Sequence, residues 1–118
     1  MTLKPVEINV YTVAGSEFCV SSTDGQKVFR LIKTALERGR PATISFANVE
    51  SLTSAFLNAA VGQLYGHFDE GQLRESLAVR DLAPADQLLL KRVVEAAKRY
   101  FADPKGVSEV HRQVLETV

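Results

Sequence analysis

Three hydroxyl side chains, Ser51, Thr53 and Ser54, cluster just before a strongly apolar segment of the chain. Serine and threonine are preferred helix N-caps, because their side-chain oxygens accept the free backbone N–H groups at the start of a helix. A phosphate is also favoured there, since the exposed amides and the helix dipole stabilise negative charge. Capping requires only one hydroxyl. The pattern therefore predicts an N-cap and leaves open a phosphorylation or anion site.

The other side chains with catalytic potential are scattered along the sequence. Cys19 has an apolar residue on either side, which indicates a buried core residue rather than a reactive thiol. His67 and His111 are far apart, and we interpret them as packing or surface residues. The sequence contains no glycine-rich phosphate loop and no CxxC or HExxH motif. We therefore expect a chain that is not an enzyme and uses neither a metal nor another cofactor.

The overall charge of the chain argues against two classes of partner, nucleic acids and membranes. Lys plus Arg and Asp plus Glu number 14 each, so the formal net charge is zero. A nucleic-acid binder usually carries a basic excess, and a peripheral membrane protein often carries a polybasic segment. We expect neither kind of partner. Zero net charge gives little colloidal repulsion, so a homodimer stays open.

The composition is that of an ordinary globular domain of 118 residues, with 46% apolar and 24% charged residues. A single cysteine excludes an internal disulfide and favours a reducing compartment. No apolar stretch reaches the roughly 20 residues of a membrane helix, and Met1–Pro5 shows no secretory signal. We expect a soluble, cytoplasmic chain.

Alternation of apolar and polar side chains predicts short strands. The segment Val6–Val13 alternates and should be a half-buried strand. Phe18–Val20 should return beside it after a turn at Ala14–Glu17, which makes a hairpin. Two more short strands are expected, one over Ala42–Ala47 and one within Ser76–Leu82.

Helical spacing of apolar side chains predicts helices between and after these strands. The first should follow Ser21–Gly25 and end at Gly39 in a left-handed C-cap. Its expected apolar stripe is Val28, Leu31, Ile32, Ala35 and Leu36. The second, over Leu52–Gly66, has so broad an apolar face that it should be covered and packed on the sheet. The third should begin near Pro84, which a first turn tolerates. Its expected stripe is Leu88, Leu89, Val93, Ala96, Ala97, Tyr100 and Phe101.

The predicted element order is β-β-α-β-α-β-α-α. Strands that alternate with helices indicate an α/β fold with a four- to five-stranded mixed, mostly parallel sheet packed against about four helices. We expect one domain, with a core over about residues 5–103 and a C-terminal helix over residues 107–118.

The segment from Ile44 to Ala60 resembles the signature of the STAS-like domain family of unknown function. In that family a strand that ends in F-x-x-V runs into a helix that starts with I-S-S-S-F. Phe46 and Val49 match the first pattern, and Leu52–Phe56 matches the second. The order of elements also fits, so the resemblance covers about residues 5–103 and implies a STAS-like fold.

The same segment is similar, more distantly, to the anti-anti-sigma factors of bacteria, in which a D-S-S-G-L box opens a helix and carries a serine that a partner kinase phosphorylates. In this chain Thr53 takes the aspartate position, Ser54 that serine, Ala55 the second serine and Phe56 the glycine. The resemblance implies a regulatory module that binds an anti-sigma or kinase-like ATPase. The expected partner-binding residues are Asn48, Glu50, Ser51, Thr53, Ser54 and Asn58, with Ser54 as the phosphorylation site.

Two other functions stay open. A sensor of a small ligand or nucleotide would use the carboxyl ends of the parallel strands and the same helix N-terminus. A structural homodimer would use the short apolar helix at the end of the chain.

Overall fold

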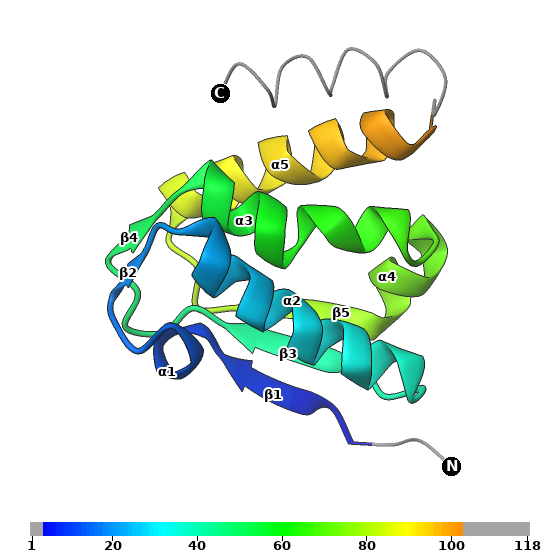
Figure 1. Ribbon diagram of the computed structural model, residues 1–118, viewed down its shortest axis with the longest axis horizontal. Helices are drawn as coiled ribbons and strands as arrows, with labels where there is room; N and C mark the ends of the chain where they lie inside the picture. The colour runs from blue at the N-terminus through cyan, green and yellow to red at the C-terminus, as the bar shows by residue number, and fades with distance from the viewer. Residues whose placement is uncertain (1–3, 103–118) are drawn as a thin grey trace.

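The computed structural model describes residues 4–102, and within them strands and helices alternate as in other α/β proteins (Figure 1). In chain order the elements are β1 (Val6–Asn9), α1 (Val10–Ala14), β2 (Phe18–Cys19), α2 (Ser22–Glu37), β3 (Ala42–Ser45), β4 (Ser51–Leu52), α3 (Ser54–Ala60), the 3-10 helix η1 (Gly62–Gly66), α4 (Glu70–Ser76), β5 (Leu77–Arg80) and α5 (Pro84–Ala102). The expected helix over residues 107–118 and His111 lie outside the described residues.

The strands form two parallel sheets. The larger has the order β1-β3-β5, with Ile8 opposite Ile44 and Ile44 opposite Val79. The smaller pairs β2 with β4. The expected α/β class with a mostly parallel sheet is confirmed, and the parallel strands β1 and β3 are joined by a crossover that contains α2. Helices α2, α3 and α5 lie on one side of the larger sheet, as Figure 1 shows.

The predicted hairpin is wrong, because the first strand stops at Asn9. The side chain of Asn9 accepts a 2.9 Å hydrogen bond from the N–H of Thr12 and caps helix α1. Gly15, expected in the hairpin turn, instead ends α1 at a φ of 75°, in the left-handed region that favours glycine. After this helix the chain enters β2, which pairs with β4 and not with β1.

Helix α2 packs on β1 and β3 and carries much of the core. Ser21 caps it by accepting the N–H of Asp24 at 3.1 Å, and Gly39 at a φ of 74° confirms the predicted left-handed end. The predicted stripe is right except for Leu31, whose side chain is 45% exposed. Phe29 is buried instead.

Helices α2 and α3 approach closely at Gly25. A Cβ atom at this position would lie 2.4 Å from the backbone oxygen of Phe56 and 2.9 Å from Cβ of Ala59. Both distances are shorter than van der Waals contact, so the packing of α2 on α3 requires a residue without a side chain. Gly25 therefore fixes the spacing of the two helices.

The predicted second helix is present as two helices, α3 and η1. Its broad apolar face is covered as expected, with Phe56, Leu57 and Leu64 fully buried. We expected this face to pack on the sheet, but its main neighbours are α2 and α5. The largest fully buried side chains among the described residues are Phe56, Ile32, Ile44, Leu57, Leu64, Leu73, Val10, Val28 and Cys19.

Helix α5 begins at Pro84 as predicted, but its buried face is rotated from the predicted one. Val93 and Ala97 are buried, whereas Leu88 is 61% exposed and Ala96 is also exposed. Three consecutive leucines, at 88 to 90, make the helical phase ambiguous in the sequence. The packing of α5 against α3 and η1 determines which side of α5 is buried. No helix in the described range 4–102 is both long and apolar enough to cross a membrane.

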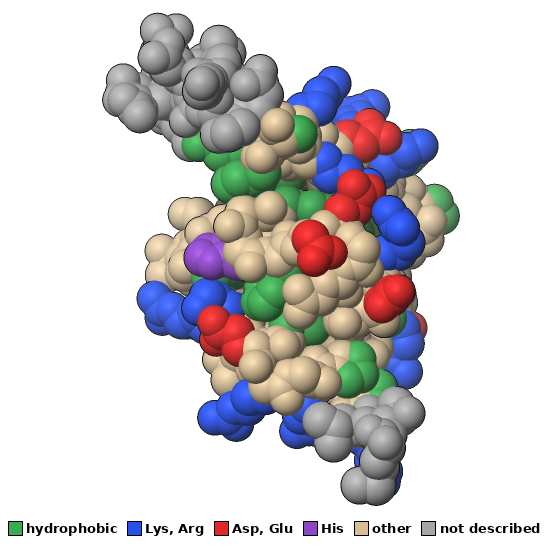
Figure 2. All heavy atoms as spheres, turned by 90° about the vertical axis from the view of Figure 1, so that its right-hand side faces the viewer, with side chains coloured by type: hydrophobic (Ala, Val, Ile, Leu, Met, Phe, Trp, Pro, Cys, Tyr) green, Lys and Arg blue, Asp and Glu red, His purple; other side chains and the backbone are tan. Residues whose placement is uncertain are grey.

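On the face that lies to the right in Figure 1, acidic and basic side chains are interspersed (Figure 2). Helix α4, which was not predicted, lies on this side of the fold. Asp69 caps it by accepting the N–H of Gln72 at 2.8 Å. Only Leu73 of this helix is buried, so its segment shows no apolar stripe.

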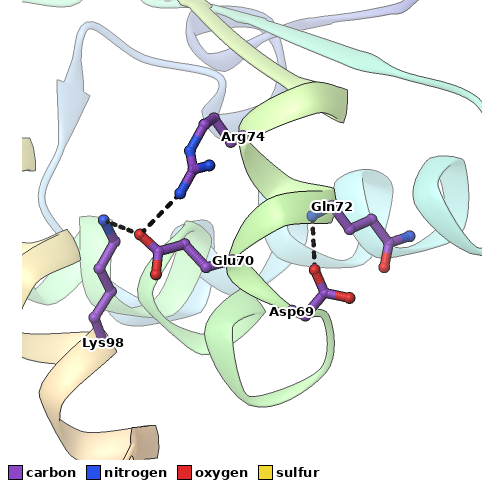
Figure 3. Close-up of polar contacts among 5 residues, drawn as sticks. All are labelled: Asp69, Glu70, Gln72, Arg74 and Lys98. Atoms are coloured by element: carbon purple, nitrogen blue, oxygen red, sulfur yellow. Dashed lines mark hydrogen bonds and ion pairs between the residues drawn. The ribbon is translucent and has the colours of Figure 1, made fainter.

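Glu70 joins α4 to α5 (Figure 3). Its Oε1 lies 2.7 Å from Nζ of Lys98 and 3.3 Å from a guanidinium nitrogen of Arg74. The hydrogen bond from Lys98, followed by the positive charge of Lys98, lowers the pKa of Glu70 below its ordinary value of 4.5. The same hydrogen bond raises the pKa of Lys98.

These shifts predict a pH-dependent contribution of Glu70 to stability. Because its folded-state pKa is depressed, the contribution is present above pH 4.5 and is lost as the pH falls through the folded-state value. We expect Glu70→Gln to lower the melting temperature at pH 7 and to match the wild type in strong acid. Melting curves over a pH series measure this, with Glu75→Gln on the exposed face of the same helix as control. A constant difference between Glu70→Gln and wild type at every pH would contradict the prediction.

Candidate functional site

The loop after β3 begins with a tight turn. The N–H of Val49 donates to the carbonyl of Phe46 at 3.1 Å, and Asn48 lies inside this turn at a φ of 68°. Asparagine adopts this left-handed backbone more readily than most residues do. The turn accounts for the residue type at position 48 and leaves its side chain exposed to solvent.

The segment that follows runs along β2. The N–H groups of Glu50 and Ser51 donate to the carbonyl of Glu17 at 2.9 and 3.2 Å, and the N–H of Thr53 donates to the carbonyl of Cys19 at 3.3 Å. These backbone bonds hold the loop against the small sheet. The loop residues therefore have a fixed position although they lie at the surface.

Thr53 is the N-cap of α3, which confirms the predicted capping. Its Oγ1 accepts the N–H of Phe56 at 3.2 Å and donates to the carbonyl of Val20 at 2.8 Å. One hydroxyl thus satisfies a free helix N–H and also ties α3 to the end of β2. Both hydrogen-bonding roles of the hydroxyl are in use, so Thr53 is a structural residue of the site.

Ser54 differs from Thr53 in both exposure and bonding. It is the first residue of α3, it is exposed, and its hydroxyl makes no hydrogen bond within residues 4–102. Ser51 is half-buried in β4. Asn58 lies one turn beyond Ser54 and is exposed on the same face of α3. Among the three hydroxyls of the cluster, that of Ser54 is the most accessible to another protein.

The structure brings the predicted partner-binding residues together at one end of the fold. We call this surface the docking rim, formed by Asn48, Glu50, Ser51, Thr53, Ser54 and Asn58. In Figure 1 it lies at the left, where β4 leads into α3.

Two apolar side chains beside the docking rim were not predicted as part of the site. Phe18 is 51% exposed and pairs with Ser51 across the small sheet. Val20 is 47% exposed, and its carbonyl is the one that Thr53 binds. Strand alternation turns Cys19 inward and its two neighbours outward. A run of three apolar residues in a strand cannot face the core completely, and this was the available signal.

Cys19 and His67 have the structural roles that their sequence context predicts. Cys19 is fully buried, and burial, followed by the negative charge of Asp24, raises the pKa of its thiol. The thiol therefore remains protonated and unreactive at neutral pH. The ring of His67 packs at 5.4 Å from that of Phe29, between ring centres.

Comparison with known proteins places this geometry in a family. The sequence model of a family described as a STAS-like domain of unknown function matches residues 24–87, which is more than half of the chain. The matched range contains all of α2 except its first two residues, strands β3 and β5 of the three-stranded sheet, and the whole docking rim. No curated protein and no solved structure matches the chain.

Proposed function

The chain belongs to the STAS-like domain family of unknown function, and from this premise we propose that it is a non-catalytic regulatory module. The module binds a kinase-like ATPase through the docking rim, in the manner that the similarity of Ile44–Ala60 to anti-anti-sigma factors suggests. Phosphorylation of Ser54 weakens this binding.

One observation carries the proposal: the accessible Ser54 directly follows Thr53 and β4, which are held by hydrogen bonds to the segment that carries two exposed apolar side chains. Thr53 connects α3 to the carbonyl of Val20, and β4 pairs with β2 next to Phe18. Exposed aromatic and aliphatic side chains in a rim of polar groups are typical anchors of protein interfaces. Phe18 and Val20 supply the apolar contact, and the docking rim supplies the polar contacts around it.

The position of Ser54 suits a switch. A phosphate adds about −1.5 to −2 charge units at pH 7, and the start of a helix stabilises it electrostatically. The free chain therefore tolerates the modification, because Thr53 keeps its capping bonds. In the complex the phosphate would lose water against the apolar contact, which costs free energy. Docking then becomes unfavourable while the fold is unchanged.

Binding measurements with purified variants test the proposal. The ATPase that co-purifies with the wild-type chain from its host is identified and titrated with each variant. Phe18→Ala should weaken binding by about tenfold or more, as truncation of an interface anchor does. Ser54→Asp should weaken it by about tenfold, because a charge then enters the interface, and Ser54→Ala should bind like the wild type.

Leu31→Ala provides the matched control, since Leu31 is similarly exposed but lies on α2 away from the docking rim. It should leave the affinity unchanged. If Phe18→Ala binds as tightly as Leu31→Ala, the docking surface is wrong. If only Ser54→Asp is without effect, the surface stands and the switch does not.

A further inference from the structure

Strand β5 has one open edge, because the larger sheet has the order β1-β3-β5. In a parallel pair, successive residues of a strand direct their backbone N–H and C=O groups alternately toward one neighbour and the other. The carbonyl of Arg80 accepts the N–H of Phe46 at 3.0 Å, so the backbone groups of Arg80 and Ala78 face β3. Those of Val79 therefore face the open edge. Val79 presents a donor and an acceptor to an additional strand.

An apolar groove runs beside this edge, between β5 and α5. It consists of two hollows, of about 750 and 270 Å³, which share Val79, Leu90 and Val94 as walls. The larger extends toward Leu82, and the smaller extends toward Leu77. We call this continuous feature the β5 groove.

The length of the β5 groove corresponds to a short extended segment. The four residues of β5 span about 13 Å at roughly 3.3 Å per residue. On α5, the eight steps from Leu90 to Lys98 span about 12 Å at about 1.5 Å per residue. An extended peptide of about four residues would pair with β5 over its whole length and would place alternate side chains in the groove.

The edge lacks the protection that exposed edges usually have. Natural proteins block such edges with charged side chains, bulges or prolines. The central residue here is a valine, and the neighbouring charge is directed elsewhere, since Arg80 forms a 2.9 Å ion pair with Glu7 of β1. Parallel sheets are normally covered by other elements, yet Ala78, Val79 and Arg80 are all exposed. The β5 edge is therefore available for pairing.

The border of the β5 groove carries one more positive than negative side chain, since Lys91, Lys98 and Arg74 lie there with Asp81 and Glu70. Glu70 is bound by both Lys98 and Arg74, and the 2.8 Å hydrogen bond that Asp81 accepts comes from the neutral hydroxyl of Ser45. Lys91, at the Asp81 end of the groove, has no ion pair within residues 4–102. Its ammonium group would attract a carboxylate of the bound segment.

A second copy of the chain fits this edge poorly. Its own β5 is followed after three residues by α5, which lines the groove together with β5. Pairing of two β5 strands about a two-fold axis would place both α5 helices on the same face of the extended sheet, where they would compete for the space beside the groove. An extended segment with no helix beside it has no such conflict.

We propose that β5 binds, by strand addition, an extended apolar segment of a partner protein that carries an acidic residue opposite Lys91. Backbone hydrogen bonds to Val79 provide affinity, and the groove selects apolar side chains at alternate positions. This surface uses none of the residues of the docking rim, so the proposal is independent of the proposed function.

A library of random twelve-residue peptides, displayed on phage and selected against the full chain, supplies the probe. Selected peptides should alternate apolar residues and carry Asp or Glu. Val79→Pro should weaken their binding by about tenfold or more, through loss of the backbone donor and of part of the groove wall. The variant should fold, because proline is tolerated where the N–H faces away from the sheet.

Glu7→Pro, measured against Glu7→Ala because both variants lose the ion pair with Arg80, is the matched control. The N–H of Val6 donates to Pro41 at 2.8 Å, so the backbone groups of Glu7 face the open edge of β1, where neither hollow lies. Glu7→Pro should bind the selected peptides like Glu7→Ala. Lys91→Glu should shift selection from acidic to basic peptides.

Three results would overturn the proposal. The first is a selection that enriches no peptide. The second is equal binding of the selected peptides by Val79→Pro and the wild type. The third is self-association of the wild type that Val79→Pro abolishes. If Val79→Pro unfolds, hydrogen exchange at the Val79 amide of the wild type decides the question. It should be fast in the free chain and slowed by the peptide, and an unchanged rate would reject strand addition. Phe18→Ala should keep peptide binding, which separates this proposal from the docking rim.

Discussion

Replacing Gly25 with alanine should lower the free energy of unfolding by about 3 kcal/mol, near the upper end of the usual cost of overpacking. The added methyl group would meet the backbone oxygen of Phe56 at 2.4 Å, and a backbone atom cannot rotate away as a side chain can. Helices α2 and α3 would have to separate. Since both belong to the core, their separation would loosen packing well beyond the mutated site. Urea unfolding followed by circular dichroism measures the change.

Gly71→Ala is the control for this substitution. Gly71 lies in helix α4, where the nearest obstacle to a Cβ atom is the carboxylate end of Asp69, at 3.3 Å. That oxygen also caps α4, but it has to shift by only a few tenths of an ångström, and the better helix propensity of alanine offsets this cost. Gly71→Ala should therefore stay within about 0.5 kcal/mol of the wild type, although the two substitutions are chemically identical. A Gly25→Ala variant as stable as the wild type would mean that α2 and α3 are not in such close contact.

Phe56→Ala should destabilise the chain by about 3–5 kcal/mol, the range found when a fully buried phenylalanine is truncated. The side chain is completely buried, and its residue lies where α2 and α3 meet. Truncation would leave a cavity that the neighbouring helices fill only partly. Ser54→Ala, two residues earlier and exposed, should stay within about 0.5 kcal/mol of the wild type. Thermal and urea unfolding of both variants give the comparison.

The contrast between these two residues bears on the likeness to anti-anti-sigma factors. Phe56 stands where their box has a glycine, and in this chain its side chain is fully buried in the core. Ser54 stands where their box has the phosphorylated serine, and it remains at the surface. If Ser54→Ala destabilised the chain as much as Phe56→Ala, Ser54 would be a structural residue. Its role as a switch would then lose its main support.

The fold could be predicted where local signals coincide. Helix α2 has a capping serine, an apolar stripe and a C-terminal glycine, and its sequence indicates all three. The strand over Ala42–Ser45 also follows from its own alternation. By contrast, the pairing of β2 with β4 joins residues that are more than 30 positions apart, and each strand has only two residues. Such short strands are defined by their partner, so no local pattern reveals them.

Two errors arose where one pattern is compatible with two structures. The apolar residues Val6, Ile8 and Val10 alternate with polar ones, which predicted one continuous strand. The same residues also fit a strand that passes directly into a helix, because Val10 is buried at the start of α1. The capping side chain of Asn9 was the signal for the helix. Helix α4 was overlooked because a glycine and a single buried leucine suggested a connection. The capping Asp69 followed by the acidic Glu70 was the signal there.

The candidate site was predicted in part. The cluster of hydroxyls indicated a cap, and Thr53 provides it. The sequence could not show that Thr53 also binds the carbonyl of Val20, since the two residues are 33 positions apart. For the same reason the exposed Phe18 and Val20 could not be assigned to this surface. Phe18 and Val20 belong to the same surface as Ser54 only because β2 and β4 pair.

The buried thiol of Cys19 offers a way to measure how fast the structure beside the docking rim opens. Cys19 lies in β2, and its carbonyl holds the N–H of Thr53. A thiol reagent can reach the sulfur only when β2 separates from its neighbours, and the raised pKa of the thiol slows reaction in the closed state further. Because the chain has no other cysteine, the time course of modification reports only those openings, local or global, that expose Cys19. The rate of Cys19 modification in the unmutated chain therefore measures how often the region next to the docking rim opens.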